Sequence, residues 1–314
     1  MLYSCQLELK ELETENFFKE DGSSIKKKNK SDYLTLSNDS FLVQFDKITG
    51  DLVSYMFDGE EYLKNAPYVN FWRAATDNDF GNKMPKRSAA WKEASNSRKL
   101  VELDVEKISR KKYKVTIVNR LENINSTTET VYTVNGKGEI LVETKFNYGG
   151  TLKNAEMPRF GMNFQLPGSF KTAKWYGRGP HENYQDRRAS AFVGEYESTI
   201  KDLYFAYARP QENGYRTENR WLELKDATGK GLKFVGLSRF SFSAHYNTIE
   251  DFDAGLKKQQ RHTIDIKPRD FVSLNIDYKQ TGVGGDNSWG AKPLQQYMLQ
   301  PADYSYSFMI LPIE

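Results

Sequence analysis

Apolar and polar residues alternate along many short stretches of this chain from Tyr33 onward. The stretch YLTLS shows the alternation first, FLVQF repeats it, and turn-forming residues separate the stretches that follow. Alternation with a period of two is typical of a β-strand that buries one face. We therefore expect strands at residues 33–37, 41–45, 52–57, 101–108, 113–119, 128–134, 140–148, 173–177, 220–226, 231–238, 240–247, 271–278 and 304–313.

Turn signals between these stretches indicate hairpins. DKITGD joins the second and third expected strands, and Asn135–Gly136 is a strong hairpin signal because both residues tolerate positive φ. Only KRSAAWKEAS, residues 86–95, has a helical pattern. Because the helices that would connect parallel strands are missing, a parallel α/β fold is not favoured. The pattern predicts an all-β fold, either a sandwich or a barrel.

The residues before the first expected strand are polar and irregular, and they include the basic run KKKNK at residues 26–30. Such a run fits a nuclear localisation signal, an anion-binding patch or a solvated linker. A short and isolated run favours the linker. We expect residues 1–32 to be a linker from a preceding domain, and residues 33–314 to be one domain of a longer protein.

The composition narrows the possible partners. The chain has 45 basic and 42 acidic residues among 314, and a formal net charge of +3. This near-balance predicts neither nucleic acid nor an anionic membrane as a partner, and no stretch approaches the roughly 20 apolar residues of a membrane span. Cys5 is the only cysteine, which excludes an internal disulfide, and the histidines lack the spacing of a metal site.

Four polar stretches interrupt the apolar strands and are the best candidates for function. We call them the first to fourth polar blocks: FWRAATDNDFGN (71–82), WYGRGPHENYQDRR (175–188), RPQENGYRTENRW (209–221) and GVGGDNSWG (282–290). Binding residues are often found on loops that a rigid scaffold holds in place. We expect the four blocks to gather at one end or on one concave face. The fourth block is unusual because it places Trp289 in a polar loop that is rich in glycine.

The first block resembles the start of an EF-hand, with Asp77, Asn78 and Asp79 in succession. That motif needs Asp or Asn at the fifth loop position, where this chain has Gly81. A turn whose side chains bond local backbone amides is therefore favoured over a metal site. The glycines of the second and fourth blocks also lack the pattern of a phosphate-binding loop.

Glu182, Asp186 and Glu212 raise the possibility of the two carboxylates of a glycosidase. Spacing cannot identify such a pair, since the fold positions it, and each carboxylate is expected to pair with a nearby arginine instead. The candidate arginines are Arg178, Arg187, Arg188 and Arg216. His181 and Glu182 are poor acid–base partners, because adjacent residues on a strand point to opposite faces.

The four blocks, in this order and at these distances, resemble the C-terminal domain of the large β-galactosidases of glycoside hydrolase family 2, the LacZ type. The same domain is the small subunit of two-subunit β-galactosidases. The resemblance covers Tyr33 to Pro312 and departs from the family pattern at Ala75, where proline is usual. It implies a β-supersandwich of the galactose-mutarotase-like fold, in agreement with the all-β pattern.

The resemblance also implies that the chemistry lies elsewhere. In this family the catalytic glutamates and the Mg²⁺ ligands belong to a TIM-barrel domain, which would need about 250 more residues. We therefore expect no catalytic residue, metal ligand or cofactor in this chain, and expect it to be inactive alone. Its partners would be a galactoside and the catalytic TIM-barrel domain or large subunit, within a parent enzyme that is oligomeric.

The resemblance assigns a role to Trp289, which in the family projects into the neighbouring active site and forms a platform for the sugar. Asp286 and Asn287 of the same loop are expected to bind substrate with it. The alternative is that Trp289 caps the core of its own sandwich. In the second block, Glu182, Asn183 and Arg187 are expected either to line the pocket or to tie the loop together.

Two other classes of function stay open. One is a stand-alone sugar-binding module. The other is an aldose 1-epimerase, which needs an acid and a base, typically Glu and His, that face one pyranose. The surroundings of His181, His245 and His262 show no epimerase-like motif, so this function is the least favoured.

Overall fold

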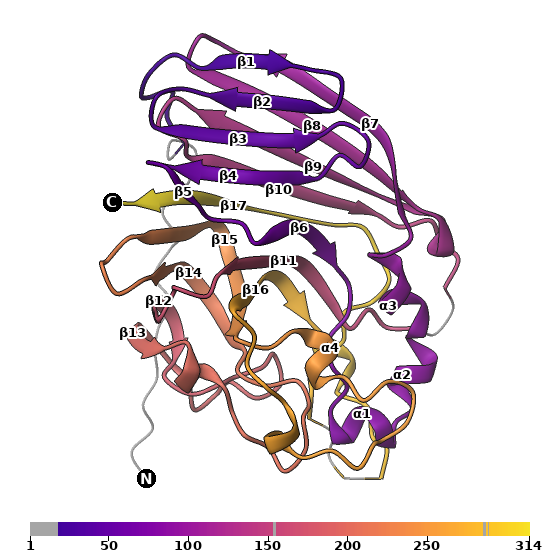
Figure 1. The fold of residues 1–314 in the computed structure, drawn as a ribbon. Coiled ribbons are helices and arrows are strands. Elements are labelled where there is room, and N and C mark those ends of the chain that lie inside the picture. Colours follow the sequence, from indigo (N-terminus) through magenta and orange to yellow (C-terminus); the bar gives the residue numbers. More distant parts are fainter. Residues whose placement is uncertain (1–17, 153–154, 285–286, 288) are drawn as a thin grey trace.

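The computed structural model describes residues 18–152, 155–284, 287 and 289–314, and this part of the chain is built mainly of β-strands in two antiparallel sheets (Figure 1). The smaller sheet has five strands and packs over part of a larger, twelve-stranded sheet. The all-β fold that the pattern predicted is thus confirmed, and of the two architectures left open, sandwich and barrel, the structure has the sandwich.

The five-stranded sheet runs in sequence order: β1 (Lys26–Asn29), β2 (Tyr33–Ser37), β3 (Phe41–Asp46), β4 (Leu52–Phe57) and β5 (Glu60–Glu61). In β3, Phe41, Val43 and Phe45 are buried while the residues between them are partly exposed, as the alternation predicted. The expectation of a linker fails at β1. This basic run is solvated, but it forms an exposed edge strand paired with β2, where lysines discourage further strand pairing.

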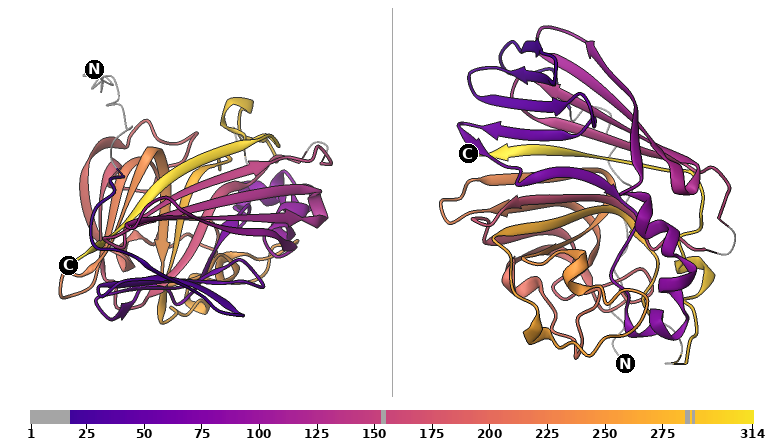
Figure 2. Two further views of the ribbon diagram at one scale, coloured as in Figure 1. Left: turned by 90° about the horizontal axis from the view of Figure 1, so that it is seen from above. Right: turned by 45° about the vertical axis from the view of Figure 1, so that its right-hand side comes forward.

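The twelve-stranded sheet contains β6 (Asn65–Asn70), β7 (Arg98–Lys107), β8 (Lys112–Leu121), β9 (Ser126–Asn135), β10 (Ile140–Asn147), β11 (Arg159–Pro167), β12 (Thr172–Gly179), β13 (Phe192–Thr199), β14 (Arg216–Lys225), β15 (Gly231–His245), β16 (Phe271–Gln280) and β17 (Tyr304–Ile313). Its main path is β13-β12-β14-β15-β17-β10-β9-β8-β7, and β16, β11 and β6 branch from β15 (Figure 2).

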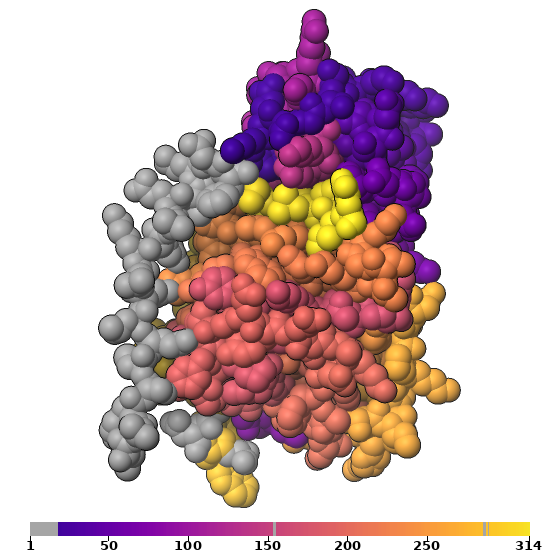
Figure 3. All heavy atoms as spheres, turned by 90° about the vertical axis from the view of Figure 1, so that its left-hand side faces the viewer, coloured from indigo at the N-terminus to yellow at the C-terminus, as the bar shows by residue number. Residues whose placement is uncertain are grey.

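The branch arises because β15 changes partners along its length. Its first half, Gly231 to Gly236, pairs with β17, and its second half, Ser241 to His245, pairs with β16. Viewed from the left of Figure 1, the strands β12 to β15 lie below the C-terminal strand and the small sheet (Figure 3). The polar blocks belong to the part of the molecule that carries these lower strands.

Aromatic packing joins the two sheets and the helices into one core. Phe45 of the small sheet contacts Tyr132 of β9, with ring centroids 5.3 Å apart, and Tyr55 donates a 2.8 Å hydrogen bond to the carbonyl of Gly138. Trp91 is fully buried and packs on Phe71 at 5.8 Å. Rings of this size bury large apolar areas and so contribute strongly to stability.

The expected helix at residues 86–95 occurs as two short helices, α2 (Met84–Arg87) and α3 (Ala89–Ala94), separated at Ser88. The Ser88 hydroxyl donates to the carbonyl of Glu156, and Trp91 Nε1 donates to that of Ala155, so tertiary contacts hold the break in place. Two further short helices are α1 (Asp77–Gly81) and α4 (Ile249–Phe252). Within the described ranges, the helices are too short to span a bilayer.

Candidate functional site

The four polar blocks meet at one end of the molecule, as the sequence predicted. Asn78 Nδ2 donates to the carbonyl of Val283 at 3.0 Å, which joins the first and fourth blocks. The amide of Asp77 donates to Gln211 Oε1 at 3.1 Å, which joins the first and third. These contacts place segments more than 130 residues apart in sequence on one surface.

Asp186 anchors the fourth block to the second. Its carboxylate accepts hydrogen bonds from the amides of Val283 (3.2 Å) and Gly284 (2.8 Å). A Cβ at Gly282 would lie 2.5 Å from this carboxylate, so only glycine fits there without a shift. The amide of Gly282 donates to the carbonyl of Tyr297 at 2.8 Å, which closes the base of the loop.

Trp289 stands out from this braced loop, with 91% of its surface exposed. Its amide donates to Asn287 Oδ1 at 2.9 Å, so Asn287 shapes the turn before the indole. Gly290 has φ +116° and lies so close to Gly81 at the end of α1 that a Cβ would be 2.8 Å from the Gly81 carbonyl oxygen. Core capping by Trp289 is therefore wrong. Asp286 lies outside the described residues.

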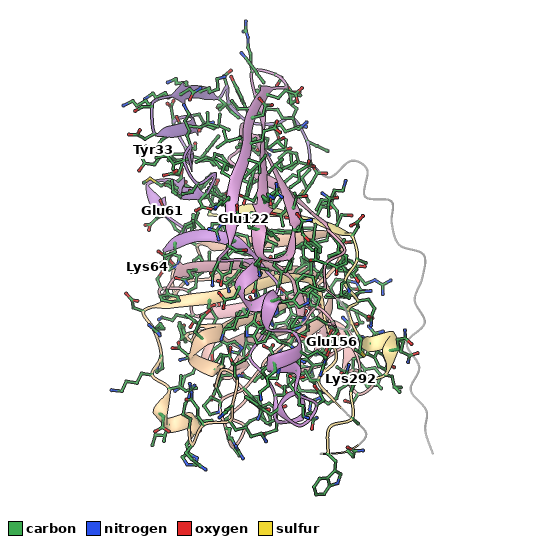
Figure 4. All side chains as sticks on the ribbon, turned by 90° about the vertical axis from the view of Figure 1, so that its right-hand side faces the viewer. Tyr33, Glu61, Lys64, Glu122, Glu156 and Lys292 are labelled. Carbon is green, nitrogen blue, oxygen red and sulfur yellow. The ribbon has the colours of Figure 1, made fainter. Side chains whose placement is uncertain are left out.

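Glu156 fixes the segment that follows the fourth block. Its carboxylate accepts hydrogen bonds of 3.1 and 3.0 Å from Arg87 Nε, and it lies 3.8 Å from Lys292 Nζ (Figure 4). Burial opposes its charged form, but the hydrogen bonds and charge of Arg87 hold the pKa of Glu156 below its ordinary value. The ionised carboxylate thus connects α2 to the chain that carries Trp289.

Glu182 ties the second block to the third. Its side chain is only 8% exposed, and it accepts hydrogen bonds from the Gly214 amide (2.7 Å), from Arg187 (2.7 Å) and from the hydroxyl of Tyr207. A carboxylate with so many internal partners has little capacity left for a ligand. The geometry therefore gives Glu182 a structural role.

Asn183 is also structural, whereas Arg187 is partly free. Asn183 is fully buried, and its Oδ1 accepts from the amide (3.0 Å) and the hydroxyl (2.6 Å) of Thr217. Arg187 is 51% exposed, and its guanidinium lies 5.1 Å from the ring centroid of Tyr184. Of these second-block candidates, Arg187 alone presents a large exposed surface.

The EF-hand-like residues begin a helix. Asp79 and Thr76 form a capping box at the start of α1, and Asp79 also lies 2.8 Å from the buried guanidinium of Arg73. Asp77 lies 2.7 Å from Lys258. The expected bonding to local amides is confirmed for Asp79. Over the described residues, there is no group of three or more His, Cys, Asp or Glu side chains that could hold a metal ion.

A buried ionic group that the sequence patterns did not reveal lies beneath the blocks. Arg159, at the start of β11, is completely buried and contacts Asp277 of β16 and Glu212 of the third block, both at 3.0 Å. Burial raises the pKa of Asp277 to about 7, against the attraction of Arg159, and it raises the pKa of Glu212 as well. One guanidinium neutralises only one carboxylate, so a proton on the second carboxylate leaves the group neutral.

The buried group of Arg159, Asp277 and Glu212 predicts that the stability of the fold depends on pH, and Asp277→Asn tests this prediction. Because the folded state holds a proton on Asp277 that the unfolded state has lost, Asp277 should lower stability as pH rises from about 4 to 7. Asparagine resembles the protonated acid and does not titrate. Between pH 5 and 7 the variant should gain about 1–3 kcal/mol relative to wild type, measured by urea unfolding at each pH. A pH-independent difference would contradict the shift.

Residues 37–310 match a protein family described as the β-galactosidase small chain. The chain belongs to this family. Among its curated relatives are the β-galactosidases of Priestia megaterium and Lactobacillus delbrueckii subsp. bulgaricus, both 33% identical to it. The first alignment covers 89% of this chain and 26% of the relative, and the second covers 86% and 26%. The chain thus spans about a quarter of the length of the curated relatives it matches.

Solved structures similar to this chain include a galactose 1-epimerase from Lactobacillus acidophilus, with 10% identity and a TM-score of 0.46. That alignment covers 92% of this chain and 98% of the epimerase. A galactose mutarotase-related enzyme from the same organism gives 10% identity and a TM-score of 0.44, with 90% and 97% covered. Likeness at this level does not indicate a shared activity.

His245 and His181 do not form the acid–base pair of an epimerase. Burial lowers the pKa of His245 to about 4, and its Nε2 bonds the carbonyl of Asn213 at 3.0 Å. His181 is exposed, and its ring bonds the hydroxyl of Ser190. In the described part of the chain, these contacts give neither imidazole a carboxylate partner, so the epimerase function stays the least favoured.

Proposed function

We propose that this chain is the C-terminal, non-catalytic domain or subunit of a LacZ-type β-galactosidase of glycoside hydrolase family 2. It completes the active site of a separate TIM-barrel domain or large subunit, which hydrolyses terminal β-D-galactose. The catalytic glutamates and the Mg²⁺ site belong to that partner, within an oligomeric parent enzyme. The carboxylates at the end where the polar blocks meet are held by arginines and backbone amides, which fits a supporting role.

The observation that carries this proposal is the exposed indole of Trp289 on a braced loop. Tryptophan is usually buried to a high degree, whereas this side chain is 91% exposed. An indole offers a flat, polarizable surface for the C–H face of a sugar, with one N–H donor. Bracing by Asp186 and Asn287 would hold that surface ready for a substrate bound in the neighbouring barrel.

The other candidate residues divide into those that contact substrate and those that support the loops. Asp286 and Asn287 accompany Trp289 at the substrate, and Asn287 also fixes the turn. Glu182 and Asn183 shape the second block from within. Arg187 lines the cavity at the junction of the blocks, and of the three second-block candidates it is the one with a largely exposed side chain.

The isolated chain should not hydrolyse a chromogenic β-galactoside above background, because the proposed catalytic residues lie in the partner. Added to a Priestia megaterium β-galactosidase from which the matched segment has been deleted, it should restore measurable hydrolysis. The control is the deleted enzyme alone, which should stay inactive. Initial rates across a range of added chain would report both association and activity.

Turnover by the isolated chain that is lost on replacing Glu182 or Glu212 would overturn the proposal. Interconversion of galactose anomers by the chain would favour an epimerase instead. Micromolar galactoside binding without any effect on the deleted enzyme would favour a stand-alone sugar-binding module. The three functions therefore give different results with one purified protein.

A further inference from the structure

A hollow of about 400 Å³ lies between the helices α1 and α2 and the loop that follows α4. Two apolar side chains and four lysines line it: Phe80, Leu256, Lys83, Lys86, Lys257 and Lys258. We call it the lysine hollow. Its described lining contains one carboxylate, that of Asp77. The charge excess at this one place is therefore as large as the formal net charge of +3 of the entire chain.

Three of the four lysines lack an acidic partner. Asp77 lies 2.7 Å from Lys258 and neutralises it. Lys83, Lys86 and Lys257 are exposed, and within the described ranges their ammonium groups form no ion pair or hydrogen bond. Like charges gathered around one hollow repel one another, so the isolated chain gains nothing from this arrangement. An acidic partner would remove the repulsion.

The backbone of Lys83 indicates that the fold does not require a lysine there. Its φ is +63°, in the left-handed region, which is unfavourable for a side chain of this kind and easy for glycine. The side chain also provides no capping hydrogen bond for α2, which begins at the next residue. Residues that are kept in an unfavourable conformation are often functional.

An apolar contact is offered among the lysines. Leu256 is 59% exposed, and the partly buried ring of Phe80 lies 5.9 Å from Lys258 Nζ. Apolar side chains with charged groups around them are typical of a protein–protein interface. Because all four lysines of the lining are exposed, they are poorly placed to hold a small molecule in one orientation. A protein surface is therefore the better fit.

The lysine hollow adjoins the loop that carries Trp289. Gly81 belongs to its lining, and a Cβ at Gly290 would lie only 2.8 Å from the Gly81 carbonyl oxygen. The matched segment is 26% of the Priestia megaterium β-galactosidase, so about three quarters of such an enzyme lies outside this chain. A partner that places its active site against Trp289 would therefore meet the hollow as well.

We propose that the lysine hollow is a docking site for an acidic segment of the catalytic domain or large subunit. Carboxylates of that segment pair with Lys83, Lys86 and Lys257, and an apolar side chain beside them packs on Leu256. Charge pairs across an interface speed association and fix the orientation of the partners. This inference rests on the proposed function, because it names the surface through which the two parts join.

The test titrates the full chain into the Priestia megaterium enzyme that lacks the matched segment. Binding is followed by the fluorescence anisotropy of labelled chain, and restored hydrolysis is followed in parallel. Changing the three lysines together, as Lys83→Glu, Lys86→Glu and Lys257→Glu, should raise the half-saturating concentration at least about tenfold. The rate at saturation should stay at the wild-type value, since these lysines take no part in the reaction. Added salt should weaken wild-type binding more than binding of the variant.

Two further variants serve as controls. Changing Lys27, Lys28 and Lys30 to glutamate alters the net charge equally, but at β1, at the opposite end of the molecule from α1 and α2 (Figure 1). This variant should bind as wild type does. Lys83→Gly should melt at the wild-type temperature or higher, because glycine accepts the left-handed backbone, and should still bind more weakly.

The outcomes separate the docking site from the proposed function. If wild type binds and restores hydrolysis but the reversal at the hollow binds as tightly, the docking site alone is overturned. Equal weakening by the reversal at β1 would overturn it too, since only net charge would then matter. Tighter binding of the chain to duplex DNA than to the deleted enzyme would assign the lysines to a nucleic acid instead. If wild type neither binds nor restores hydrolysis, the proposed function fails and the docking site fails with it.

Discussion

Arg159→Met should lower the free energy of unfolding by about 3–5 kcal/mol at neutral pH, because it removes the cation from a fully buried group. Asp277 and Glu212 would remain in the core without a positive partner, and both would have to bind protons or stay charged and poorly solvated. Urea unfolding followed by tryptophan fluorescence measures the loss.

Arg269→Met is the matched control for this loss. Arg269 bonds Asp251 through two nitrogens, but its side chain is 50% exposed, so its removal should change stability far less than the removal of Arg159. Adding Asp277→Asn and Glu212→Gln to Arg159→Met should recover much of the lost stability, since the buried charges are then gone. Equal losses from Arg159→Met and Arg269→Met would contradict the importance of burial.

The alternation of apolar and polar residues predicted strands best where one face is buried and the other partly exposed. β8 (Lys112–Leu121) follows this rule, since Tyr113, Val115 and Ile117 are buried and the residues between them are only partly so. β11 was missed because both of its faces are buried, and Asn163 inside it bonds Ser273 and Asn275. β13 was missed for the opposite reason, because it is an edge strand without a fully buried residue.

The local pattern of apolar and polar residues also could not predict which strands pair with one another. Two strands were expected at residues 231–238 and 240–247, whereas β15 is one strand that changes partners between them. The basic run at residues 26–30 has no apolar alternation, and its strand β1 exists because β2 offers an unpaired edge. Pairing of this kind depends on segments far away in the sequence.

The site could be predicted as a region but not residue by residue. Four polar interruptions of apolar strands indicated a common surface, and the contacts of Asp186 and Asn78 confirm it. An arginine partner was expected for each acidic candidate. Glu182 does pair with Arg187, but Asp186 bonds backbone amides, and Glu212 pairs with Arg159 from outside the blocks. Such pairs are set by the fold, since 53 residues separate Arg159 from Glu212.

Trp289→Ala should weaken galactoside binding by the complete enzyme by about 1–3 kcal/mol, or roughly tenfold to hundredfold, as expected when an aromatic stacking platform is removed. The thermal stability of the chain should hardly change, because the indole is 91% exposed and supports no core. Trp289→Phe should recover part of the affinity, since a smaller flat ring remains. Inhibition constants of a galactoside analogue, with melting curves of each variant, measure both effects.

Trp91→Ala provides the opposite case in the same chain. Trp91 is fully buried, packs on Phe71 and donates to the carbonyl of Ala155, so its loss should destabilise the fold by about 3–5 kcal/mol. Loss of a tryptophan that supports the fold lowers the melting temperature, whereas loss of a tryptophan that only contacts substrate lowers the affinity alone. If Trp289→Ala melted as early as Trp91→Ala, or bound galactosides as tightly as wild type, Trp289 would not be the platform that its exposure indicates.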